Sequence, residues 1–235
     1  MKRIVVLLML AVAIPTGTAL SQPNGFDSQL SALRKDIIAV CGRLQAGKPD
    51  GGPAQLTAAI DTIVAGWNVL KGSYRDNPPE VYANDPAWKG YFVEADDNFS
   101  LMRTKAAEGN YKRAVQFCGL NCALFVKIHQ VNGAESVTDR LFSLRQAVKT
   151  VQAMVAAGNR RGAKLLLKRH RTDFDNMPGV KIYGIEGTEI RSDINLLKEG
   201  FIALIKTLDE ENREVVNDVF VKYLAKFNGI YVKYI

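Results

Sequence analysis

The chain has 235 residues, of which 47% are hydrophobic and 23% charged, a composition typical of a globular protein with a sizeable core. This composition excludes intrinsic disorder and collagen-like structure. Lys and Arg number 31 against 24 Asp and Glu, so the formal net charge is +7, which is only mildly basic.

The first residues have the parts of a secretory signal peptide. Lys2 and Arg3 precede an apolar run over residues 4–14, and the small residues Ala19 and Ser21 follow. The run is too short to span a bilayer. We expect residues 1–21 to be removed, and the mature protein to be periplasmic or secreted without a transmembrane helix. Cleavage after Ala19 and a retained membrane anchor are the alternatives.

Apolar residues recur every three or four positions through most of the remaining chain, which predicts amphipathic helices. Asn132 and Gly133, which accept a left-handed backbone, end the fourth predicted helix. The first half of the chain contains four such segments: 28–46, one through Leu56–Leu70 that Pro78 ends, one that begins with Asp85 as N-cap before Pro86, and 111–131.

The pattern then begins again. Leu33-Arg34 has a counterpart in Leu144-Arg145, and the end of the first helix at Gly47 has one in Gly158, at a constant offset of 111 residues. The second half predicts helices at about 137–157, 160–175, 188–207 and 211–233. We therefore expect an all-α fold of two tandem antiparallel four-helix bundles, 22–133 and 134–235. The alternative is a chance likeness between amphipathic helices.

One stretch resembles a known family. Its residues are Pro86-Ala87-Trp88-Lys89, Phe92, Phe99, Ala106-Ala107-Glu108-Gly109-Asn110, Cys118 and Cys122. They are similar to the last two helices of the cytochrome c′ family. The resemblance implies that family's four-helix architecture and, through the repeat, the same architecture in both halves.

The haem-attachment motif of that family is absent. It consists of Cys-x-x-Cys-His, whereas here Cys118 and Cys122 are four residues apart, and Ala123 follows. The family's haem-binding residues therefore cannot be carried over. His129 could supply an axial ligand from later in the helix, which keeps haem as an alternative.

The three cysteines allow three interpretations. Cys118 and Cys122 share a helix face, and Cys41 lies near the end of a helix that faces them in an antiparallel bundle. Cys41 could form a disulfide with Cys118 or Cys122, since an exported protein can keep one. The three cysteines could instead bind a soft ion such as Cu(I). His129 would join that metal site only if other ligands complete it. Reduced core thiols are the third interpretation.

The strongest charge feature of the second half is a basic run over residues 160–171, within one predicted helix. We expect Leu165, Leu166 and Phe174 to line another, apolar face of the same helix. A solvated face is the default, and an acidic protein partner or another anionic surface is the functional alternative. Nucleic acid is not expected outside the cytoplasm. The candidate partner-binding residues are Arg160, Arg161, Lys164, Lys168 and Arg171.

The sequence lacks a nucleophile elbow, a P-loop, a His-Glu-x-x-His motif and a dinucleotide fingerprint. We therefore expect an exported helical binding or interaction protein rather than an enzyme, and assign it no cofactor. The alternative is a periplasmic metal-binding or haem-binding protein that acts in electron transfer or copper handling through the cysteines of the first bundle.

Overall fold

A computed structural model describes residues 25–47, 52–177, 187–210 and 212–234. These residues form eight α-helices and one 3₁₀-helix and no strand, so the predicted all-α class is confirmed. None of these helices is long and apolar enough to cross a membrane. The predicted signal peptide, 1–21, lies outside the described residues. The helices are α1 (Gly25–Gln45), α2 (Gly52–Tyr74), η1 (Glu80–Tyr82), α3 (Trp88–Ala107), α4 (Tyr111–Val131), α5 (Val137–Ala156), α6 (Arg160–Asp175), α7 (Gly187–Thr207) and α8 (Arg213–Tyr234).

Two of the helix connections use the same pair of residues, a glycine followed by an asparagine. Gly109 and Gly158 have φ angles of 74° and 83°, a left-handed backbone that only glycine adopts without strain. The side chains of Asn110 and Asn159 then accept backbone N–H groups in the first turns of α4 and α6. The chain therefore reverses direction within a few residues at both places.

The start of α3 differs from the prediction. Asp85 is not its N-cap, because its carboxylate accepts the backbone N–H of Ala87 at 2.8 Å and the side-chain amide of Asn132 at 2.8 Å. Backbone hydrogen bonds from Asp85 to Tyr82 and from Trp88 to Asp85 form successive turns before the helix. The helix therefore begins only at Trp88, and Pro86 lies in a turn.

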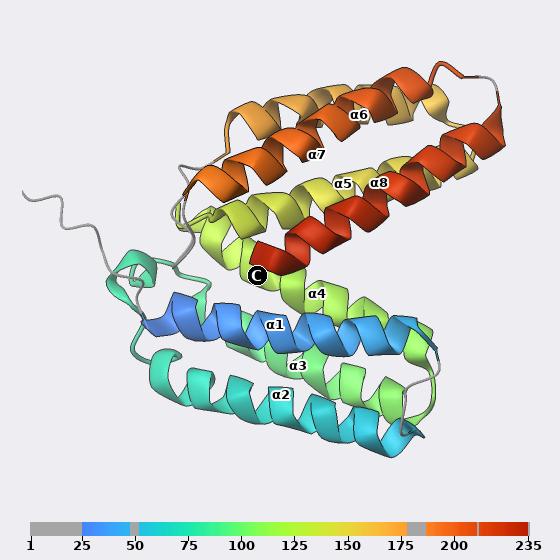
Figure 1. Cartoon of the computed structure of the whole chain (residues 1–235). Helices are drawn as coiled ribbons and strands as arrows, with labels where there is room; N and C mark the ends of the chain where they lie inside the picture. Colours follow the sequence, from blue (N-terminus) through green and yellow to red (C-terminus); the bar gives the residue numbers. More distant parts are fainter. Residues whose placement is uncertain (1–24, 48–51, 178–186, 211, 235) are drawn as a thin grey trace, which may run out of the picture.

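The helices fall into two sets of four neighbours (Figure 1). In the first set, α1 and α3 each pack against α2 and α4. In the second set, α5 and α7 each pack against α6 and α8. The sets are stacked so that α1 and α4 face α5 and α8, while α2 and α3 lie on one outer side and α6 and α7 on the other (Figure 1).

Aromatic rings fill the core of each set. In the first set, the Trp67 ring is stacked on Phe92 and Phe125, with ring centres 5.1 and 5.9 Å apart. In the second set, Phe201 makes edge contacts with Phe174 and Tyr223. These rings are buried, and truncation of such a side chain to alanine typically costs about 3–5 kcal/mol. Each set is therefore held together by its own aromatic core.

Candidate functional site

The cysteine prediction is resolved in favour of a disulfide. Cys41 of α1 and Cys118 of α4 are bonded, with Cα atoms 6.0 Å apart and a sequence separation of 77 residues. Cys122, one helical turn after Cys118, is a buried free thiol. Of the two pairings that the sequence left open, the structure contains Cys41–Cys118.

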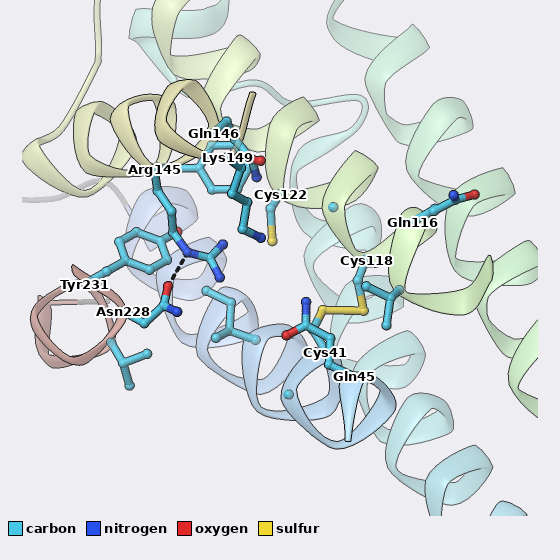
Figure 2. A pocket seen from close by; sticks show the side chains of 16 residues that line it. Cys41, Gln45, Gln116, Cys118, Cys122, Arg145, Gln146, Lys149, Asn228 and Tyr231 are labelled. Carbon is cyan, nitrogen blue, oxygen red and sulfur yellow. Dashed lines mark hydrogen bonds between the residues drawn. A yellow bond between two sulfur atoms is a disulfide. The ribbon is translucent and has the colours of Figure 1, made fainter. Parts of the chain in front are cut away.

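All three cysteines line a cleft between the two sets of helices (Figure 2). The cleft has a volume of about 420 Å³ and is lined by residues within 38–45 of α1, 115–122 of α4, 142–149 of α5 and 228–232 of α8. Apolar surface dominates its walls, and Phe142 and Tyr231 contribute aromatic rings. This combination of size and lining is typical of a binding site for a small organic molecule.

Two cations of α5 line the cleft without a carboxylate partner. Arg145 and Lys149 turn toward the side on which Cys122 and the disulfide lie (Figure 2). The Nε–H of Arg145 donates to the Asn228 side chain, and its guanidinium lies 5.8 Å from the Tyr231 ring centre. Within the described part of the chain, no Asp or Glu lines the cleft or forms an ion pair with either cation.

Burial lowers the pKa of both cations. Removal from water lowers the pKa of Arg145. Burial and, after it, the positive charge of Arg145 lower the pKa of Lys149. For Arg145 the cause is the loss of water around a charge, and for Lys149 the repulsion from a neighbouring cation adds to it. The cleft is therefore an electropositive pocket in which an anion would be stabilised.

Beside the cleft, four buried side chains connect the two sets of helices. Asp139, at the start of α5, accepts a hydrogen bond from Arg34 of α1 at 2.6 Å. Its second oxygen pairs with His129 Nδ1 of α4 at 2.7 Å. Arg34 also donates to the Tyr231 hydroxyl of α8 at 3.1 Å. We call Arg34, His129, Asp139 and Tyr231 the polar junction. It ties α1 and α4 to α5 and α8.

The local sequence positions Asp139 for this role. Ser136 is the N-cap of α5, and its hydroxyl accepts the backbone N–H of Asp139. In return, the Asp139 carboxylate accepts the backbone N–H and the hydroxyl of Ser136. This reciprocal capping box fixes the carboxylate at the helix start. One carboxylate therefore caps α5 and binds both Arg34 and His129.

The polar junction is ionised. Burial alone would lower the pKa of His129, but its hydrogen bond to Asp139 and the nearby Asp27 carboxylate, 3.6 Å from Nε2, raise that pKa to about 9. Burial alone would raise the pKa of Asp139, yet His129 and Arg34 hold it well below its usual range. At neutral pH the junction therefore contains the His129 cation, the Asp139 anion and the Arg34 cation.

The four residues proposed from the sequence as soft-metal ligands are not grouped as one site. Cys41 and Cys118 are bonded to each other, Cys122 is a free thiol in the same cleft, and His129 belongs to the polar junction. The described residues contain no group of three or more His, Cys, Asp or Glu side chains suited to a metal ion.

The residues also do not fit a covalently attached haem. One cysteine of the α4 pair is used in the disulfide, Ala123 follows the other, and Asp139 holds His129 through Nδ1. Among the described residues, the side chains near the cysteines therefore do not reproduce the thioether pair with an adjacent histidine that such attachment needs.

The predicted basic face on α6 divides into paired and exposed residues. Lys164 forms an ion pair with Asp209, and Arg160 donates to the backbone carbonyl of Glu210. Arg161, Lys168 and Arg171 are exposed. The predicted apolar face needs a correction. Leu165 is 62% exposed, while Leu167 is buried instead, because it shares a helix face with Ala163 and Phe174.

Sequence reasoning missed the polar junction, although two signals for it were present. Arg34 and Arg145 are the arginines of the repeated Leu-Arg pair, and both lie between the two sets of helices. Ser136 three residues before Asp139 is the spacing of a capping box. Neither signal shows that Asp139 pairs with a residue 105 positions away.

Fold and site together define an all-helical protein with an electropositive cleft beside a buried ionic junction. Comparison of the chain with models of protein families, with curated proteins and with solved structures found no match.

Proposed function

We propose that this chain is an exported helical binding protein that holds a small organic molecule in the cleft between α1, α4, α5 and α8. The observation that carries the proposal is the cleft itself, whose volume of about 420 Å³ lies within the range of ligand pockets, about 300–1,000 Å³. Its walls are mainly apolar, with a few polar groups that could orient a ligand. The proposal is one of binding and includes no reaction.

The proposal includes two tandem antiparallel four-helix bundles, 22–133 and 134–235, arranged as in the cytochrome c′ family but without its haem site. The order of neighbours supports it, because it is the same in both sets of helices. The left-handed glycines Gly47 and Gly158 support it too, since they end equivalent helices at the offset of the repeat.

The disulfide supports the export part of the proposal. Disulfides persist in oxidising compartments such as the bacterial periplasm and the extracellular space, and they are rare in the cytosol. The Cys41–Cys118 bond links α1 to α4 and joins distant parts of the chain, and Cys118 is buried while Cys41 is half-buried. We therefore propose that the mature protein acts in the periplasm or outside the cell.

The cleft can be blocked with a single substitution. Gly119 of α4 lines the cleft, and a Cβ atom added there meets nothing within 4 Å. Gly119→Trp should fill the cleft, whereas Gly119→Ala should leave it open. Gly72→Trp on α2 is the matched control, since Gly72 also has open space but lies away from the cleft.

The probe is phenylnaphthylamine, a neutral aromatic compound whose fluorescence rises in apolar surroundings. Wild type, Gly119→Ala and Gly72→Trp should bind it with similar affinity, and Gly119→Trp should bind it at least about tenfold more weakly. Circular dichroism should show all four proteins equally helical. Equal binding by Gly119→Trp and wild type would show that the cleft is not the binding site, and the proposal would be wrong.

One observation favours a second candidate, a soft-metal site in the reduced chain. Cys118 Sγ lies 3.4 Å from Met102 Sδ. Reduction of the disulfide would therefore leave the thiolates of Cys41 and Cys118 beside a thioether, ligand types that suit Cu(I).

Competition with a Cu(I) chelator tests this candidate. The reduced protein should hold one Cu(I), Met102→Leu should hold it more weakly, and the oxidised protein should hold none. Equal Cu(I) retention by the oxidised and reduced proteins would contradict it.

A further inference from the structure

We infer, on the basis of the proposed function, that the ligand of the cleft is an organic anion, with its negative group between Arg145 and Lys149 and its apolar body against the walls. The ligand chemistry is that of a carboxylate or sulfonate attached to an aromatic or aliphatic body. Three observations lead to this inference.

The first observation is the uncompensated charge of the cleft. Arg34 lies next to it, but Asp139 already neutralises that guanidinium at 2.6 Å. Arg145 and Lys149 have no such partner among the described residues, and no described Asp or Glu lines the cleft. An anionic group between these two cations would offset a repulsion that the protein leaves unrelieved.

The second observation is that Arg145 is held in place. Its Nε–H donates to Asn228, and the Tyr231 ring lies under its guanidinium at 5.8 Å. The terminal nitrogens point away from Asn228 toward the side of Cys122 (Figure 2). A guanidinium fixed in this way can donate two parallel hydrogen bonds to one carboxylate or sulfonate.

The third observation is the size and apolarity of the remaining walls. Ile38 of α1, Val115 of α4, and Phe142 and Val232 of α5 and α8 supply apolar surface around a volume of about 420 Å³. An inorganic phosphate or sulfate would leave this surface in contact with water. An anion with an apolar body would bury this surface, which is favourable because apolar surface is removed from water.

Two probes of matched shape separate charge from apolar burial. Anilinonaphthalene sulfonate has the aromatic body of phenylnaphthylamine and carries a sulfonate in addition. Wild-type protein should bind the sulfonate at least about tenfold more tightly than the neutral probe, as expected for a charge-assisted hydrogen bond. Higher salt concentration should weaken only the binding of the sulfonate.

Single-charge variants locate the effect. Arg145→Gln and Lys149→Gln should each weaken sulfonate binding about tenfold and leave binding of the neutral probe within about twofold. Lys168→Gln is the control, because it removes one positive charge from the exposed surface of α6. It should change the binding of neither probe. Gly119→Trp should weaken both probes, which would assign the fluorescence to the cleft.

A competition experiment decides what kind of anion the cleft takes. Octanoate should displace the bound sulfonate, whereas inorganic phosphate at equal ionic strength should not. If phosphate displaces the sulfonate as effectively as octanoate does, the inference that the anion is organic is wrong.

The remaining outcomes separate this inference from the proposed function. If the neutral probe binds in the cleft but the sulfonate has no advantage, or if both charge variants bind it like wild type, the anion inference is wrong and the binding function stands. If neither probe distinguishes Gly119→Trp from wild type, both the inference and the proposed function are wrong.

Discussion

At the residue scale, Asp139 combines three roles. Its carboxylate caps α5, accepts from Arg34 and pairs with His129, and its side chain is completely buried. A buried charge is tolerated only when partners replace the water it loses. The same argument applies to Arg34 and His129, which have exposures of 4% and 9%. The three charges therefore depend on one another.

Removal of the Asp139 charge should be strongly destabilising. Asp139→Asn would leave the buried Arg34 and His129 without their shared anion, a change that typically costs about 3–5 kcal/mol. Urea unfolding followed by circular dichroism measures this as a loss in the free energy of unfolding. Asp61→Asn is the matched control, because the Asp61–Arg103 pair lies at the surface, and it should change stability little. Similar stability of the two variants would contradict the assigned role of Asp139.

The polar junction should also make stability depend on pH. Folding raises the pKa of His129 from 6.5 to about 9, so the folded protein binds this proton more tightly. The stabilisation is fully present below about pH 6.5 and is lost as the pH rises to about 9. The free energy of unfolding should fall over this interval by at most about 3 kcal/mol.

His129→Gln is the variant that tests this pH dependence. Wild type should be more stable than the variant at pH 6.5, and this difference in the free energy of unfolding should shrink toward pH 9. The reason is that only wild type loses the His129 proton over this interval. Parallel curves for the two proteins would show that His129 does not carry the charge. Asp27 and Asp139, the carboxylates that face His129, remain in both proteins.

At the scale of elements, the helices follow from local pattern. Spacings such as Leu30, Leu33 and Ile37 in α1 place apolar residues on one side of a helix, and that side is buried. The helix ends at Gly47 and Gly133 follow from the left-handed backbone. Such signals need only a few adjacent residues, so the sequence alone predicts them.

The site was less predictable because its parts are far apart in the sequence. The pairing of Arg34 with Tyr231 joins residues 197 positions apart. Nothing near either residue indicates the other, and the cleft exists only because α1, α4, α5 and α8 come together. The disulfide could be anticipated, since antiparallel packing places the end of the first helix beside the start of the fourth. The prediction that Asp85 caps α3 was wrong. The Asp85 carboxylate accepts a hydrogen bond from Asn132, which lies 47 residues later and could not be paired with it from the sequence.

Two glycines should respond in opposite directions to the same substitution. Gly109 has a φ of 74°, whereas Gly72 lies within α2, and an added Cβ has open space at both. Gly109→Ala should destabilise the protein by about 1 kcal/mol, because alanine avoids a left-handed backbone. Gly72→Ala should stabilise it by up to about 1 kcal/mol, because alanine favours a helix. Thermal unfolding measures both, and a shift in the same direction would show that the two backbones do not differ as described.

At the scale of the whole molecule, long-range links tie together helices that are far apart in the sequence. The Cys41–Cys118 bond joins α1 to α4 within the first set, and the polar junction joins both of these helices to α5 and α8. The cleft lies beside both links. The positions of its walls therefore depend on the disulfide as well as on the polar junction.

Loss of the disulfide should destabilise the oxidised protein. The bond closes a loop of 77 residues, for which chain entropy predicts a stabilisation of about 4 kcal/mol. Cys41→Ser should therefore lower the free energy of unfolding under oxidising conditions, and a reductant should bring wild type to about the same level. Cys122→Ser retains the bond and should respond to reductant as wild type does. Thiol titration of the unfolded, unreduced proteins should find one thiol in wild type, that of Cys122, and two in Cys41→Ser, while three thiols in wild type would contradict the bond.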